Sequence, residues 1–135
     1  MKKLETIQKE HRLNDVYATD EPGAGGACHL FMIVKAGSAT LNAETEDVTL
    51  RLDPNNMVET IAFQHGPRGV KGSQPGVLDC DLLEIVRDRL TDFQRGEYAC
   101  EENRAALEHI EAALRFMNKR VEDRAKRGVL GTNNK

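Results

Sequence analysis

Residues 78–127 of this 135-residue chain decide its fold, and they read LDCDLLEIVRDRLTDFQRGEYACEENRAALEHIEAALRFMNKRVEDRAKR. In the first part of this stretch, apolar residues recur at every third or fourth position, which is the spacing of one helix face. Asp79 or Asp81 can cap the start of this helix. The same spacing returns in residues 99–127 and predicts a longer second helix. Because few residues around Gly96 separate the two, we expect an antiparallel hairpin with this glycine as a left-handed helix stop.

Ahead of the hairpin, apolar residues recur at every second position, which is typical of β-strands. Leu30–Val34 predicts a strand buried on both faces, and Val48–Leu52 and Met57–Phe63 predict two strands with alternating faces. Ala39–Ala43 predicts a short strand, and Asp53–Asn56 has the composition of a turn. We therefore expect a small antiparallel sheet with meander-like connections.

The expected fold class is α+β, with a small N-terminal antiparallel β-sheet followed by a C-terminal two-helix antiparallel hairpin. Residues 1–29 are expected to be a polar N-terminus with a Gly-rich loop, residues 30–77 the β-sheet region with a loop, and residues 78–135 the hairpin with a tail. The aromatic content of 4% and the absence of Trp predict an aliphatic core. Because so short a chain buries little surface and its second helix outruns the first, we expect an oligomer.

Composition excludes several classes of function. The formal net charge of −3 and the pI of about 5.8 argue against DNA binding. The three cysteines lack CxxC spacing, and the neighbours Cys28 and His29 cannot readily point at one ion, so we expect no disulfide framework, metal or cofactor. Neither a membrane span of about 18 apolar residues nor a signal peptide is visible, which predicts a soluble intracellular protein.

Residues 115–127 form a basic segment in this acidic protein. Arg120, Asp123, Arg124 and Arg127 are spaced to share one helix face. Arginines this close repel each other unless an anion lies between them. Asp123 can serve in part, but a phosphate would serve better because guanidinium groups make forked hydrogen bonds to it. Two simpler interpretations stay open. The basic residues either complement the partial negative charge at the helix C-terminus or form a charged face exposed to solvent.

Three further residues are candidates for ligand binding. Asn103 lies on the apolar stripe of the second helix. Its amide is either satisfied by hydrogen bonds near the turn or available to bond to the edge of a purine base. Phe93, beside the turn, is either part of the core or a platform on which a nucleobase stacks. Arg68 follows the rigid Gly66-Pro67 pair, which can aim its side chain. No catalytic motif such as GxSxG or HExxH occurs, so the sequence indicates no enzyme.

Four motifs follow one another in the second half of the chain, at Phe63–Pro67, Asp81–Leu90, Phe93–Asn103 and Arg120–Thr132. In this order they resemble the phage Thoeris anti-defence protein one family, whose helical hairpin is shared with phage anti-CBASS sponge proteins. The resemblance implies a non-enzymatic protein that sequesters cyclic ADP-ribose isomers made by bacterial TIR immune proteins in the host cytoplasm. It also implies a homo-dimer or a hexamer (a trimer of dimers), and it suggests cyclic di- or trinucleotides as a second ligand class.

The resemblance further implies a role for individual residues. Phe93 and Asn103 would hold the adenine by stacking and hydrogen bonding. Arg120 and Arg68 would reach the pyrophosphate or the ribose. The ligand would lie between subunits, so that a small chain can bury much of its surface.

Three more positions belong to the same implied pocket, which Asp123 and Arg124 would line or brace and Thr132 would close. His65 and Glu101 depart from the residues common in the family, which leaves the ligand isomer open. Two other functions are kept as alternatives. One is a helical-hairpin adaptor that contacts a protein or a nucleic acid, and the other is a hydrolase that clears the cyclic nucleotide.

Overall fold

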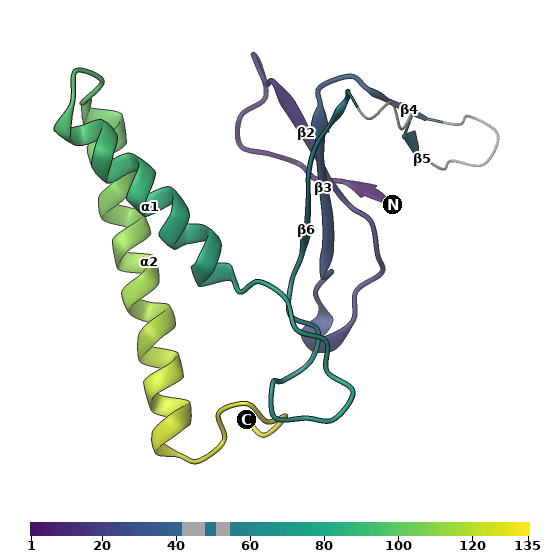
Figure 1. The fold of residues 1–135 in the computed structure, drawn as a ribbon, viewed down its shortest axis with the longest axis vertical. Helices are drawn as coiled ribbons and strands as arrows, with labels where there is room; N and C mark the ends of the chain where they lie inside the picture. The colour runs from purple at the N-terminus through teal and green to yellow at the C-terminus, as the bar shows by residue number, and fades with distance from the viewer. Residues whose placement is uncertain (42–47, 51–54) are drawn as a thin grey trace. The chain divides into compact units, whose positions relative to one another are not determined.

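The computed structural model describes residues 1–41, 48–50 and 55–135, and the chain divides into two compact units, Met1–Gly66 and Pro67–Lys135. The strands belong to the first unit and the helical hairpin to the second (Figure 1). The α+β fold class predicted from the sequence is confirmed. Within the described ranges, no helix combines the length and the apolar character that crossing a membrane requires.

The first unit is built from antiparallel strands. They are β1 (Lys2–Lys3), β2 (Asn14–Ala18), β3 (Leu30–Lys35), β4 (Ala39–Leu41), β5 (Val48–Leu50) and β6 (Met57–Ala62), with a 3-10 turn η1 (Ala24–Gly26). One sheet has the strand order β1-β2-β3-β6, and β4 pairs with β5 in a separate two-stranded sheet. The predicted small antiparallel sheet is therefore confirmed, but β4 and β5, which were expected to belong to it, form a second sheet. Because β3 pairs directly with β6, the β4–β5 hairpin is an excursion between two neighbouring strands.

The predicted strands are found where the structure describes the chain. Strand β4 covers the first residues of the predicted Ala39–Ala43, and β5 covers the first residues of Val48–Leu52. The remaining residues of both, and the first half of the predicted turn Asp53–Asn56, lie outside the described ranges. Strand β6 begins directly after the described half of that turn.

Strand β2 lies in the polar N-terminal segment, for which the sequence predicted no strand. The side chain of Asp15 in this strand is buried, with Lys3 Nζ 3.0 Å from one carboxylate oxygen and Arg12 Nη2 3.4 Å from the other. The Gly37 amide donates a hydrogen bond to it at 3.0 Å. Burial raises the pKa of Asp15, but the Gly37 amide and the two cations outweigh burial and hold it below its ordinary value. Because this buried carboxylate interrupts the alternation of apolar residues, the sequence pattern did not predict the strand.

The core of the first unit is small. Tyr17, Ala18 and Val34 are its buried apolar residues among those described, and the rings of Phe31 and Phe63 meet edge to face with centroids 5.5 Å apart. The prediction that Leu30–Val34 is buried on both faces is wrong, because only its last residue is buried. A four-stranded sheet of short strands has too little cover to bury both of its faces.

The Gly-rich loop ends on a pair of stacked histidines. The rings of His29 and His65 are parallel, with centroids 4.1 Å apart. A Cβ at Gly23 would lie 2.8 Å from His65 Nε2, so a larger residue here would have to displace the His65 ring. The Asp20 carboxylate accepts hydrogen bonds from the amides of His29 and Leu30. In the described part of the chain, no three His, Cys, Asp or Glu side chains are grouped so that they could hold a metal ion.

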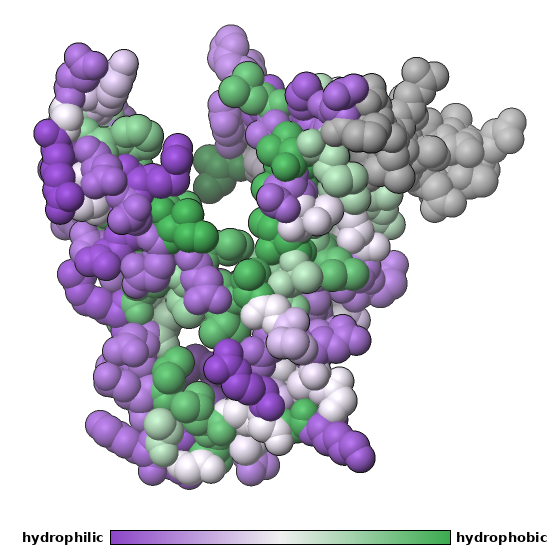
Figure 2. All heavy atoms as spheres, in the orientation of Figure 1, coloured by the Kyte–Doolittle hydropathy of each residue, from purple (hydrophilic) through white to green (hydrophobic). Residues whose placement is uncertain are grey.

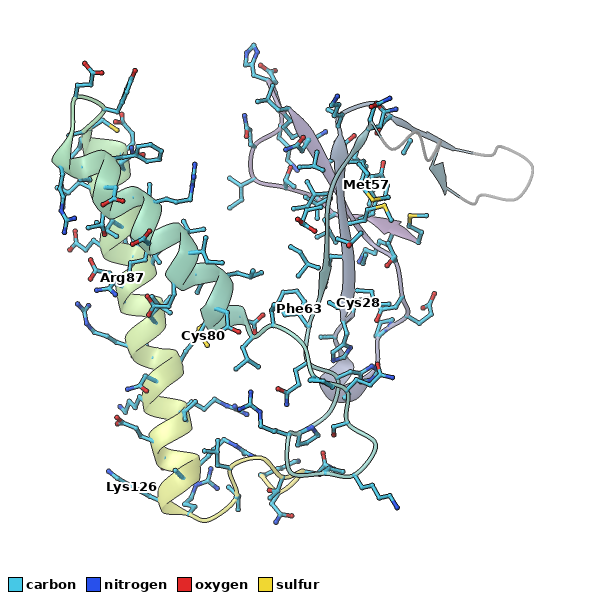
Figure 3. The ribbon with its side chains drawn as sticks, viewed as in Figure 1. Cys28, Met57, Phe63, Cys80, Arg87 and Lys126 are labelled. Atoms are coloured by element: carbon cyan, nitrogen blue, oxygen red, sulfur yellow. The ribbon has the colours of Figure 1, made fainter. Side chains whose placement is uncertain are left out.

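The second unit contains α1 (Asp79–Arg95) and α2 (Glu101–Lys126), which form the predicted antiparallel hairpin (Figure 1). Helix α2 has 26 residues and α1 has 17, so the last turns of α2, residues 118–126, extend beyond the start of α1. We call these residues the overhang. No residue of either helix is buried, and hydrophilic residues cover most of the hairpin face visible in Figure 2. Arg87 of α1, labelled in Figure 3, pairs with Glu111 of α2 at 3.4 Å.

Two predictions about the ends of α1 have different outcomes. The capping aspartate is confirmed, because Asp81 accepts a hydrogen bond from the Leu78 amide at 2.8 Å. The left-handed stop at Gly96 is wrong, since its φ of −113° lies in the extended region. The turn is closed instead by Gln94, whose side-chain amide exchanges two hydrogen bonds with the backbone of Cys100, at 3.0 and 3.1 Å.

Candidate functional site

The seven residues predicted to bind ligand all lie in the second unit, at opposite ends of helix α2. The group near the hairpin turn consists of Phe93 and Asn103. The other group lies at the overhang end of α2, where the loop after Pro67 meets the C-terminal tail. It consists of Arg68, Arg120, Asp123, Arg124 and Thr132.

At the hairpin turn, side-chain hydrogen bonds fix the spacing of the two predicted residues. Gln94 holds the backbone of Cys100 from the last turn of α1, directly after Phe93. The backbone N–H of Asn103 in turn donates a hydrogen bond to Cys100 Sγ, which caps the start of α2. Sequence reasoning gave no role to Gln94 or Cys100, although both stand in the motif that runs from Phe93 to Asn103.

Phe93 and Asn103 both keep a free side-chain surface. The Phe93 side chain is 40% exposed, and the Arg89 guanidinium lies 5.5 Å from its ring centroid. Asn103 is half-buried, and its side-chain amide makes no hydrogen bond to any described residue. No described residue satisfies this amide within the turn, so it is accessible to water or to a ligand. A ring and an unpaired amide at one helix junction can stack on a planar base and bond to its edge.

At the overhang end, Arg120 and its neighbours differ in how they are engaged. Arg120 is exposed, and it pairs with no acidic group among the described residues. Asp123 pairs with Arg127 at 3.0 Å, so it does not neutralise the space between Arg120 and Arg124 as the spacing suggested. Arg120 therefore carries a positive charge that is available to an anion.

Arg124 is half-buried and is occupied by the chain itself. Its Nη2 atom donates hydrogen bonds to the carbonyls of Val129 at 3.0 Å and Thr132 at 3.2 Å. The hydroxyl of Thr132 donates to the same Val129 carbonyl at 2.6 Å. Both predicted residues thus hold the C-terminal tail, residues 128–135, against the end of α2.

The loop that carries Arg68 is connected to this end of α2 through Gly69, the next residue in the chain. The Gly69 amide donates a hydrogen bond to the Gly131 carbonyl at 2.8 Å, which ties the loop that carries Arg68 to the tail. Arg68 itself is exposed and makes no hydrogen bond or ion pair in the part of the chain that the structure describes. Two unpaired arginines, Arg68 and Arg120, are therefore associated with one end of the hairpin.

The two groups are far apart within one chain. Asn103 and Arg120 lie on one continuous helix, and at about 1.5 Å of rise per residue they are about 25 Å apart along its axis. A single small nucleotide cannot contact both ends of that helix at once. Within one chain, then, the predicted base-binding and phosphate-binding residues are separate half-sites.

Arg104, another arginine of the hairpin, is neutralised by acidic partners. Arg104 makes hydrogen bonds to Glu101 and Glu108, and the hydrogen bond from Arg104 holds the pKa of Glu101 below its ordinary value.

Arg115 is exposed and contributes to a groove of about 240 Å³ between the helices. That groove is lined by Glu84, Arg87, Glu111, Leu114, Arg115 and Asn118, none of which is a predicted site residue.

Comparison with known proteins identifies the family. The sequence profile of the Acb2/Tad1 hairpin domain matches residues 55–122, about half of the chain. That match includes Arg68, Phe93, Asn103 and Arg120 and ends before Asp123. The chain is also similar to the protein named Thoeris anti-defense 1 of Bacillus phage SBSphiJ7, with 37% identity over 117 residues that cover 81% of each chain. The chain therefore belongs to the Thoeris anti-defence family.

Proposed function

We propose that this protein is a phage anti-defence protein that binds a cyclic ADP-ribose isomer and sequesters it, uncleaved, in the cytoplasm of the infected host. Bacterial TIR immune proteins would supply this ligand. The observation that carries the proposal is the set of unpaired groups on the hairpin, in a chain similar to Thoeris anti-defense 1. That set comprises the Phe93 ring and the Asn103 amide at one end and the Arg68 and Arg120 guanidinium groups at the other.

The chemistry of these groups suits a nucleotide that carries a base and a pyrophosphate. A base stacked on Phe93 is worth about 1–3 kcal/mol, and the Asn103 amide can both donate to and accept from adenine. Arg68 and Arg120 can make forked, charge-assisted hydrogen bonds to phosphate oxygens. A ring, an amide and guanidinium groups supply neither a nucleophile nor a proton-transfer group near neutral pH. Such a site favours tight binding of the intact ligand over turnover.

The distance along α2 supports a site shared by two subunits. If two hairpins pack antiparallel, the turn of one chain lies beside the overhang of the other, which joins the two half-sites. Apolar side chains exposed on the hairpin also favour such packing, since Phe116 is 73% exposed, Ile85 59% and Val121 45%. The proposed assembly is a homo-dimer, or a hexamer made of three dimers.

A sequestration experiment tests the proposal directly. The purified protein is incubated with a cyclic ADP-ribose isomer at a slight excess of protein, the protein is removed by filtration, and the filtrate is tested for activation of the TIR-dependent effector. We expect the activity to disappear from the filtrate and to return when the retained protein is denatured by heat. Mass spectrometry should find the released ligand unchanged.

Other results would support a different function. Recovery of a cleaved product would indicate a hydrolase. Ligand left in the filtrate, together with in-cell activity that survives Phe93→Ala and Arg120→Ala, would indicate a helical-hairpin adaptor. A parallel incubation with a cyclic di- or trinucleotide, alone and in competition, tests whether this second ligand class binds and whether it uses the same site.

A further inference from the structure

We infer that the C-terminal tail, residues 128–135, positions Arg68 for the ligand, with Gly69 and Arg124 as the positioning residues. This inference rests on the proposed function, in which Arg68 meets the ligand's pyrophosphate. It concerns a segment that lies beyond the matched residues 55–122 of the hairpin domain.

Arg124 is the anchor of the tail on α2. One of its guanidinium nitrogens donates to two tail carbonyls, those of Val129 and Thr132, and its own carbonyl accepts a hydrogen bond from the Val129 amide at 3.0 Å. Arg127 adds a contact further along, donating to the Lys135 carbonyl at 2.7 Å. The contacts of Arg124 use one guanidinium nitrogen and its backbone carbonyl, which gives this residue a structural role in holding the tail.

The tail in turn holds the loop that carries Arg68. Gly131 lies in the left-handed region, with φ of 74°, and its carbonyl accepts the hydrogen bond from the Gly69 amide. A Cβ at Gly69 would lie 2.5 Å from the Gly131 carbonyl oxygen, which is far inside van der Waals contact. Position 69 therefore has to be glycine if the loop and the tail are to approach this closely.

The consequence is a fixed connection from α2 to Arg68. Arg124 holds the tail, the tail holds Gly69, and Gly69 is the neighbour of Arg68. Arg120 stands one turn before Arg124 on the same helix, so the connection also sets where Arg68 lies relative to Arg120. Two arginines held in place before the ligand arrives bind a pyrophosphate more tightly than two mobile ones, because less side-chain and loop freedom is lost on binding.

A double-mutant cycle tests the connection. Affinity for a cyclic ADP-ribose isomer is measured by calorimetry for the wild type, Gly69→Ala, Arg68→Ala and the double variant. If Gly69 acts through Arg68, Gly69→Ala weakens binding about ten-fold or more, and the double variant binds no more weakly than Arg68→Ala alone. Gln74→Ala is the control, because Gln74 lies in the same loop, is exposed and makes no side-chain hydrogen bond to a described residue, and we expect its affinity to stay within about two-fold of the wild type.

Opposite results overturn the inference. It fails if Gly69→Ala binds like the wild type, or if the losses of the two single variants multiply in the double variant.

A second measurement separates this inference from the proposed function. Hydrogen exchange of the amides in residues 68–72, measured without ligand, should be faster in Gly69→Ala and Arg124→Gln and unchanged in Gln74→Ala. If the wild type binds no ligand, the proposed function fails, while the exchange result still tests the connection. If exchange is unchanged in both positioning variants, the connection is refuted even if sequestration is found.

Discussion

Arg120 is an exposed arginine without an acidic partner in the described chain, and Arg115 on the same helix has the same character. We expect Arg120→Ala to weaken binding of a cyclic ADP-ribose isomer about ten- to a hundred-fold, because it removes a charge-assisted hydrogen bond to the phosphate. Arg115→Ala removes the same charge from another turn of α2 and should leave the affinity nearly unchanged. Calorimetry on both variants checks this, and equal losses would mean that only the general charge of the helix matters.

Phe93 is expected to act through its ring. Phe93→Ala should cost about 1–3 kcal/mol of binding free energy, which corresponds to about a five- to a hundred-fold weaker affinity. Phe93→Tyr keeps the ring and should retain most of the affinity. If the tyrosine variant loses as much as the alanine variant, Phe93 supports the fold of the turn and does not stack on the base.

Asp15 makes the first unit sensitive to acid. Its pKa is lower in the folded chain than its ordinary value of 3.8. A lowered pKa gives stability that is complete above the ordinary value and is lost as the pH falls through the folded-state value. The free energy of unfolding should therefore decrease on acidification below about pH 4.

The matched variants for this prediction are Asp15→Asn and Glu10→Gln. Asp15→Asn should lower the free energy of unfolding by about 1–3 kcal/mol at pH 7 and flatten its dependence on acid pH. Glu10 is a highly exposed carboxylate, and its change to glutamine should alter neither. Urea unfolding followed by circular dichroism at several pH values measures both. Because hydrogen bonds from the His29 and Leu30 amides also lower the pKa of Asp20, part of the acid dependence should remain, and a dependence as steep as that of the wild type in Asp15→Asn would contradict the assignment.

The hairpin turn is the element that sets the spacing of Phe93 and Asn103, the proposed base-binding half-site. Gln94→Ala removes both hydrogen bonds to the Cys100 backbone and should lower the free energy of unfolding by about 1–2 kcal/mol. Ligand affinity should fall as well, because Phe93 and Asn103 lose their fixed spacing. Gln94→Glu retains the acceptor for the Cys100 amide and should lie between the wild type and alanine. Thermal unfolding and calorimetry give the two quantities, and an unchanged affinity would show that the turn forms without this contact.

The elements differed in how well the sequence predicted them. Helices α1 and α2 begin and end within two residues of the predicted positions, because a long apolar stripe of helical period is a local signal. Strand β2 was missed because Asp15, a buried carboxylate paired with Lys3 and Arg12, replaces an apolar residue. Lys3 meets Asp15 only because β1 pairs with β2 in the folded sheet.

At the scale of the whole molecule, the proposal requires two subunits for one site. Phe93→Ala and Arg120→Ala disable different half-sites, so a mixed dimer should contain one site with both defects and one intact site. Co-expression of the two variants with different tags should restore about a quarter of the wild-type binding capacity, if subunits pair at random. Each variant alone provides the control. No recovery in purified mixed dimers would show that the two residues act in the same half-site or that one chain forms the whole site.

The sequence by itself determined the α+β class, the hairpin and the kinds of residue available for a nucleotide, because periodicity and residue chemistry are local properties. It could not assign partners to those residues. Only the tertiary structure showed that Arg124 holds the tail while Arg120 has no acidic partner among the described residues. The physical reason is that a hydrogen-bond partner comes from wherever the folded chain passes. For Arg124 that partner is the tail that folds back after Gly128, and for the Gly69 amide it is the Gly131 carbonyl of the same tail.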